Sequence, residues 1–249
     1  MEQEIFCKID MLYKMHKKGL LGGEVMPEDC NPGLEKSSKE NYLYFTLPMA
    51  LNYQRNSYTL WANALKTYAD ETTNFVFSPN IVVDMPFSEV QTALTKYGVA
   101  LQKQKQTEIW IKLCNSIATR YNGDIRMLFN TLDADAEKVR AFMQGEAKKD
   151  FPYLSGNKIC NYWLYVLYQY TNMEYKDIAC LTVAPDTHVI KATHALGIIS
   201  DDELTSANVS LIVIKRWNEL LAGTKYNPID LHTPLWLWSR NGFCKIECV

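Results

Sequence analysis

The sequence lacks any apolar run of the roughly 18 residues that a membrane span needs. Residues 1–18 mix charged with apolar side chains and form no signal-peptide core. We therefore expect a soluble intracellular protein, in the cytoplasm or nucleoid, with no membrane partner. The 249 residues are 47% hydrophobic, enough to bury a large core, which argues against a disordered chain.

Tight cysteine spacing is also lacking. The chain has seven cysteines, and the only close pair is Cys244 and Cys248, which has neither a second pair nor the histidines of a structural zinc or iron-sulfur site. An odd number of dispersed cysteines in a long chain is typical of reduced thiols. We expect no disulfide framework, no metal and no other cofactor.

An excess of positive charge is missing too. The formal net charge is -2, which argues against a nucleic-acid partner because proteins that neutralise phosphates usually carry a basic surface. The charges are unevenly placed, however: lysines gather in 103–112 and 148–158, and acids in 133–137 and 200–203. This pattern leaves open either a local basic face or ordinary solvated helix faces.

Strands alternating with helices and repeats of solenoid length are both absent, which disfavours a parallel α/β sheet and a repeat array. Apolar residues recur instead every three or four positions, as at Ile5, Ile9, Leu12 and Met15. We predict helices over 2–18, 39–52, 57–69, 87–94, 103–120, 124–128, 135–147, 157–170, 187–196, 204–221 and 228–238. The predicted fold class is all-α.

Two segments lack the helical pattern. Residues 19–37 are rich in glycine and proline and are predicted to form a loop. Residues 75–85 combine β-branched residues with prolines, which predicts an extended connector. Asp186 stands where an N-cap would precede a helix, and the acidic run 200–203 precedes the helix over 204–221.

A hairpin between two helices is predicted around residues 150–157. Pro152 and Gly156 make a short turn, after which the helix over 157–170 begins at once. Such a turn exposes backbone N–H groups at Gly156 and Asn157, where the helix dipole favours a DNA phosphate. The alternative is an ordinary helix corner with a turn glycine.

A second stretch, Val183-Ala184-Pro185-Asp186-Thr187-His188-Val189, follows downstream. Together with the hairpin and Lys158, it resembles the helix-hairpin-helix DNA glycosylase superfamily, specifically over about residues 150–197. The resemblance implies a two-domain helical fold with a cleft between the domains. A central domain, 57–170, would end in the helix-hairpin-helix, and residues 1–56 plus 171–249 would form the second.

The resemblance also implies the catalytic residues: Lys158 as the attacking amine and Asp186 as its partner carboxylate. Breaking an N-glycosidic bond builds positive charge on the sugar, which a carboxylate stabilises, and an amine can capture C1′ as a Schiff base. The alternatives are that Asp186 is only an N-cap and Lys158 only a surface lysine. We interpret His188 as a structural neighbour satisfied by a hydrogen bond.

A third stretch, Asn227–Arg240, resembles the C-terminal helix of archaeal-type 8-oxoguanine glycosylases. That resemblance implies that Asp230 and Trp236 line a base pocket, because a flipped base needs a stacking face and a polar partner at its edge. The alternative is core packing, which we prefer for Trp238.

The chain departs from the family pattern at three points. Leu154 stands where the first hairpin glycine would be, so that only Gly156 remains and phosphate binding by the hairpin could be altered. Residues 172–180 lengthen the separation of Lys158 from Asp186 with an inserted turn or short helix. The iron-sulfur cysteines of some relatives are missing.

The expected function is base-excision repair: a monomeric DNA glycosylase with AP lyase activity that removes an oxidised purine, such as 8-oxoguanine, from double-stranded DNA. Gln54 or Arg55 would fill the gap that the rotated nucleotide leaves. Two alternatives remain open. One is a nucleosidase that acts on a small modified nucleoside through Asp186 without DNA, and the other is a non-catalytic helical binding protein.

Overall fold

The computed structural model describes residues 2–22 and 26–246, and every regular element among them is a helix. The all-α prediction is confirmed for these residues. The chain divides into two compact units, one formed by residues 25–177 and the other by residues 1–24 together with 178–249. We call them the central unit and the terminal unit.

The central unit contains the helices of the middle of the chain. They are η1 (Pro27–Asp29), α2 (Lys39–Thr46), η2 (Pro48–Leu51), α3 (Ser57–Ala69), η3 (Asn74–Phe77), α4 (Pro79–Val82), α5 (Phe87–Lys96), α6 (Lys103–Tyr121), α7 (Arg126–Thr131), α8 (Ala136–Gln144) and α9 (Asn157–Tyr170). Within the predicted loop 19–37, only η1 is helical among the described residues, and residues 23–25 lie outside the described part.

The terminal unit joins the first helix to the last third of the chain. Its helices are α1 (Glu2–Lys17), η4 (Ile178–Cys180), α10 (Thr187–Ala195), α11 (Asp201–Leu204), α12 (Val209–Leu221), η5 (Pro228–Leu231) and α13 (His232–Arg240).

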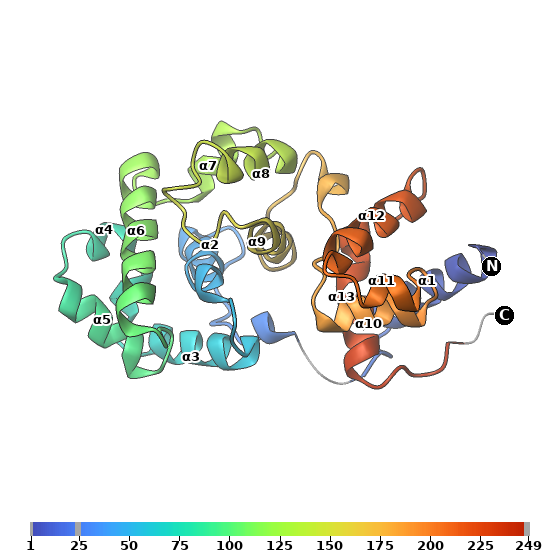
Figure 1. Ribbon diagram of the computed structural model, residues 1–249. Helices are drawn as coiled ribbons and strands as arrows, with labels where there is room; N and C mark the ends of the chain where they lie inside the picture. The colour runs from blue at the N-terminus through green and yellow to red at the C-terminus, as the bar shows by residue number, and fades with distance from the viewer. Residues whose placement is uncertain (1, 23–25, 247–249) are drawn as a thin grey trace. The chain divides into compact units, whose positions relative to one another are not determined.

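Buried aromatic side chains fill the core of the central unit, where α2 packs on α9 and both α4 and α5 pack on α6 (Figure 1). Trp110 and Trp163 are fully buried. The Trp163 indole N–H donates to Thr46 Oγ1 at 3.0 Å, and that of Trp110 donates to the Val76 carbonyl at 2.8 Å. Each ring therefore buries a large apolar area while its N–H group keeps a partner.

The observed boundary of the central unit differs from the predicted one, because residues 25–56 belong to it. The side chain of Asn41 in α2 donates to the Tyr170 carbonyl at the end of α9, at 2.9 Å. The Tyr42 hydroxyl donates to Asn172 Oδ1 at 2.9 Å. These contacts join segments about 130 positions apart, and sequence periodicity does not reveal them.

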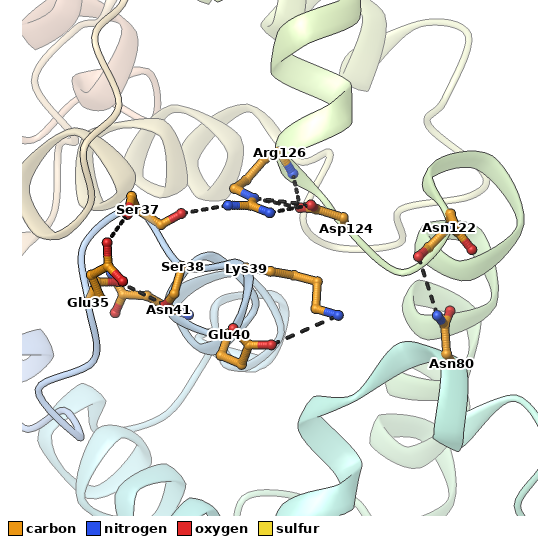
Figure 2. Close-up of polar contacts among 10 residues, drawn as sticks. All are labelled: Glu35, Ser37, Ser38, Lys39, Glu40, Asn41, Asn80, Asn122, Asp124 and Arg126. Carbon is orange, nitrogen blue, oxygen red and sulfur yellow. Dashed lines mark hydrogen bonds and ion pairs between the residues drawn. The ribbon is translucent and has the colours of Figure 1, made fainter.

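An arginine fork joins the start of α2 to the start of α7 (Figure 2). Arg126 donates to both carboxylate oxygens of Asp124 and, through Nη1, to the Ser37 carbonyl at 2.6 Å. The neighbouring Ser38 caps α2 by accepting from the Asn41 N–H at 3.2 Å. A planar guanidinium suits this role because it presents several donors in fixed directions.

The segment 75–85 holds most of η3 and all of α4, followed by a turn, so the predicted extended connector is wrong. Pro79 occupies the first turn of α4, where its missing N–H has no intrahelical partner to lose. Val76 and Val82 are completely buried. Tertiary burial of these β-branched residues thus outweighs their low helical propensity.

Two predicted helices are interrupted. The helix expected over 39–52 ends at Thr46, and Pro48 begins the separate helix η2. The helix expected over 204–221 is divided into α11 and α12 by residues 205–208. The acidic run expected before this helix is itself helical, because α11 begins there with a reciprocal capping box between Ser200 and Glu203.

The terminal unit is organised around α13, which packs against α10 and α1. Ile9 and Leu12 of α1 are buried, in agreement with the apolar pattern of this helix. Trp217 of α12 is fully buried and donates its indole N–H to Thr193 Oγ1 on α10 at 2.9 Å. This packing fixes α10 and α13, the two helices that carry the candidate site of this unit.

The cysteines follow the prediction only in part. Cys7 is disulfide-bonded, so the expectation of a reduced thiol is wrong at this position. Cys114 and Cys160 are buried thiols, and burial raises the pKa of Cys160 to about 12. Cys248, half of the only close pair, lies outside the described residues.

A carboxyl group is buried in the core of the central unit. Glu28 of η1 is only 1% exposed. Its Oε2 accepts a hydrogen bond from the Tyr162 hydroxyl at 3.1 Å, whereas Oε1 has no partner among the described residues. Burial raises the pKa of Glu28 to about 7, although the hydrogen bond from Tyr162 acts to lower it. The neighbouring Asp29 carboxylate adds to the rise.

This raised pKa makes the stability of the protein depend on pH. Above the ordinary pKa of 4.5, the unfolded chain loses the Glu28 proton while the folded protein retains it up to about pH 7. The stability that the protonated Glu28 side chain contributes is therefore fully present below pH 4.5. This contribution is lost as the pH rises through 7, which lowers the free energy of unfolding by up to roughly 3 kcal/mol. We expect Glu28→Gln to be increasingly more stable than the wild type between about pH 5 and 8. Urea unfolding across this range measures the difference, and a constant difference would contradict the burial argument.

Candidate functional site

Asp186 lies at the N-terminus of α10, as the sequence predicts. Its backbone is extended, and its Oδ1 accepts hydrogen bonds from the N–H groups of His188 and Val189, both at 2.9 Å. The preceding Pro185 is buried and cannot continue a helix backwards. The half-buried carboxylate thus satisfies two donors of the first turn and lies at the positive end of the helix dipole.

The second oxygen of Asp186 has a partner on another helix. The Trp236 indole of α13 donates its N–H to Asp186 Oδ2 at 2.9 Å. An ordinary N-cap needs no such contact, because the first turn of the helix is already satisfied through Oδ1. Three N–H groups therefore orient this carboxylate, and the site of the terminal unit is built on the contact between α10 and α13.

Further side chains surround Trp236. His188 meets it edge to face, with ring centroids 5.3 Å apart, and its Nδ1 lies 3.3 Å from Ser239 Oγ. The guanidinium of Arg240 lies 5.1 Å from the centre of the Trp236 ring, within cation–π range. His188 thus has the hydrogen-bond partner that the sequence analysis expected for it.

Ser239 and Arg240, which lie near Trp236 and His188, were not among the residues predicted for the site. They follow Trp236 by three and four positions, so they share its face of α13. That spacing was the available signal. The spacing did not stand out because the apolar residues of α13 dominate its pattern. Trp238 is one of these apolar residues, and it is buried as expected.

The two residues expected in a base pocket have different surroundings. Trp236 is buried and contacts Asp186. Asp230 belongs to η5, where its Oδ2 accepts from the backbone N–H of Asn227 at 3.2 Å and from its side-chain amide at 2.9 Å. Trp236 therefore belongs to the Asp186 site, and Asp230 serves as a cap next to α13.

Lys158 lies in the central unit, in the first turn of α9. Its side chain is exposed, and no ion pair is formed between it and the described carboxylates. Gly156 is the N-cap of α9 and Asn157 its first residue, and both are exposed. A Cβ on Gly156 would lie 3.2 Å from the Tyr153 carbonyl, so a close backbone approach accounts for the glycine.

The turn before α9 is anchored to α6. Ser116 donates through Oγ to the Asp150 carbonyl at 2.7 Å. The Asp150 carboxylate pairs with Lys112 at 3.3 Å and with Arg120, and these bonds lower its pKa. Residues 145–156 therefore connect α8 to α9 as a turn with a defined path along α6 (Figure 1).

Metal-binding residues do not gather anywhere in the part of the chain that the structure describes, since no group of three His, Cys, Asp or Glu side chains is suitably placed. Within the same residues, no helix combines the length and the hydropathy of a membrane span.

Comparison with known proteins identifies no family model and no curated protein that matches the chain. The function is therefore inferred from the side chains of this protein and from the motif around Asp186.

Proposed function

We propose that this protein is a DNA N-glycosylase with AP lyase activity, which removes an oxidised purine such as 8-oxoguanine from double-stranded DNA. Lys158 is the nucleophile and Asp186 the carboxylate that assists it. The proposal requires the amine and the carboxylate to reach the same deoxyribose. The observation that carries it is the carboxylate of Asp186, held by three N–H donors, one of which comes from a different helix.

The surroundings of Asp186 suit the stabilisation of a cation. Loss of a base from deoxyribose develops positive charge at C1′ and O4′, and a preorganised carboxylate stabilises that charge without reorienting during the reaction. The hydrogen bonds from α10 and from Trp236 supply this preorganisation. Because the side chain is half-buried, one edge of it is still accessible to a ligand.

The surroundings of Lys158 suit a nucleophile. The side chain extends from the first turn of a 14-residue helix and is exposed. Because Lys158 forms no ion pair with a described carboxylate, none has to be broken before it reacts.

The proposed reaction proceeds in balanced steps. The ammonium of Lys158 passes a proton through Asp186 to the departing base, so that Asp186 is again a carboxylate. The free amine forms a bond to C1′ while the C1′–N9 bond breaks, and the electron pair of that bond leaves with the base. The nitrogen on C1′ then loses a proton and O4′ takes one up as the C1′–O4′ bond opens, which gives the Schiff base. Loss of a C2′ proton lets β-elimination break the 3′ C–O bond, the phosphate leaves with the electron pair, and water hydrolyses the imine and releases Lys158.

The test is borohydride trapping with the full chain and duplexes that each contain one lesion. Borohydride reduces the Schiff base to a stable amine, so we expect a covalent protein–DNA adduct with an oxidised purine and none with undamaged DNA. Release of a base from a free nucleoside, without DNA binding, would favour a nucleosidase that uses Asp186 alone. If neither adduct nor base release is found, the protein is a binding protein in which Asp186 only caps α10.

A further inference from the structure

The turn before α9 contains a tyrosine in a left-handed backbone conformation. Tyr153 has a φ of 63°, which is unfavourable for a side chain with a Cβ. Its carbonyl accepts the Gly156 N–H at 3.0 Å, which closes the turn. Such a conformation persists only where other contacts compensate for it.

The compensating contact is a stack of two tyrosine rings. Tyr153 lies on Tyr53 with ring centroids 4.2 Å apart and an angle of 13° between the planes. Tyr53 comes from the segment between η2 and α3, so the pair joins two segments 100 positions apart in the chain. Both rings are half-buried, and stacking of this kind adds to the stability gained from burial.

A lysine is positioned on this stack. Nζ of Lys105, near the start of α6, lies 5.1 Å from the centre of the Tyr153 ring and 5.7 Å from that of Tyr53. Lys105 is exposed, and it forms no ion pair with a described carboxylate. A hydrogen bond with Tyr153 raises the pKa of Lys105, so the group keeps its charge at neutral pH.

The surroundings of Lys105 are basic although the chain as a whole is not. Segments 103–120 and 145–158 hold seven basic residues and three acidic ones. One of the acids, Asp150, is already paired with Lys112 and Arg120. Lys148 and Lys149 in the same turn are exposed.

We propose that Lys105, positioned on the Tyr53–Tyr153 stack, binds a DNA phosphate. The Gly156 N–H is already bonded to the Tyr153 carbonyl, so a side chain and not the backbone of this turn makes the contact. This inference rests on the proposed function, because it names a further contact with the same DNA. A lysine ammonium binds phosphate as a point charge, and aromatic rings that direct the ammonium reduce the ordering required when it binds. The strained backbone of Tyr153 is then explained, since it brings the ring beneath Lys105.

Lys105→Gln tests the contact through the salt dependence of binding. Affinity for a labelled undamaged duplex is measured by fluorescence anisotropy between about 50 and 200 mM salt. We expect binding to weaken roughly three- to tenfold, and the slope of log K against log salt to become less negative by about 1. Lys66→Gln is the matched control, because Lys66 is also an exposed lysine of the central unit.

Tyr153→Leu tests the stack. If the rings position Lys105, this variant weakens binding in the wild-type background but adds little to Lys105→Gln. Equal affinities and salt slopes for Lys105→Gln, Lys66→Gln and the wild type, with a wild-type adduct still trapped by borohydride, would overturn this inference and leave the proposed function standing. A wild-type chain that neither binds the duplex nor forms the adduct would overturn both.

Discussion

Lys158→Gln is expected to abolish the borohydride-trapped adduct completely. Glutamine is close to lysine in length but has no nucleophilic nitrogen, because its amide lone pair is delocalised. Lys158 is exposed and forms no ion pair with a described carboxylate, so the change is expected to alter stability by no more than about 0.5 kcal/mol. Denaturing gel electrophoresis of a labelled lesion duplex, after reaction with borohydride, measures the adduct.

The matched control is Lys191→Gln, because Lys191 is an exposed lysine on α10, the helix that Asp186 caps. We expect this variant to retain the wild-type yield of adduct. An adduct that survives in Lys158→Gln and is lost in Lys191→Gln would contradict the assignment of the nucleophile. It would place the reactive amine in the terminal unit instead.

Asp186→Asn is expected to slow base excision by roughly 10²–10³-fold, the usual loss when one preorganised group that stabilises transition-state charge is removed. Asparagine is as good an N-cap as aspartate, so α10 should still begin at Thr187. The carbonyl of the new amide can also still accept a hydrogen bond. Single-turnover excision, measured with enzyme in excess over a lesion duplex, isolates the chemical step.

Two further variants separate charge from folding at this position. Asp186→Ala removes the cap as well as the charge, and we expect it to lower the free energy of unfolding by about 1–2 kcal/mol relative to Asp186→Asn. Trp236→Phe keeps the Asp186 carboxylate and removes the indole N–H that donates to its Oδ2. If Asp186→Asn excises base at the wild-type rate, the carboxylate has only a capping role and the proposed mechanism fails.

Helix positions could be predicted from the sequence wherever local signals decide them. Asp186 caps α10 as expected, since a cap depends on bonds to residues two or three positions away. Prediction failed at residues 75–85, where burial of Val76 and Val82 overrides their local preference. The packing that buries them is not encoded within the segment.

The candidate site could be predicted only in part, for the same reason. The motif proposes Asp186 and Lys158 as site residues, but the bond from Trp236 to Asp186 spans 50 positions and depends on the packing of α13 on α10. Arg55, expected from its residue type to fill a gap in DNA, donates instead to the carbonyls of Gly98 and Val99, whereas its neighbour Gln54 is exposed. Partners of this kind depend on the tertiary structure.

Tyr153 shows a further limit of motif comparison. Leu154 stands where the family pattern has a glycine, which predicted an altered hairpin. In the structure Leu154 is fully buried, and the preceding residue, Tyr153, adopts the left-handed conformation. The turn thus places its strain on a residue whose ring makes a stabilising contact.

The bond between Trp236 and Asp186 also makes the carboxylate observable by spectroscopy. The chain has six tryptophans, and each indole N–H gives a separate signal in a nitrogen–proton NMR spectrum. The Trp236 signal can be assigned by its loss in Trp236→Phe. Since that N–H donates to the carboxylate oxygen, its chemical shift would follow the arrival of a sugar beside Asp186 in the intact protein.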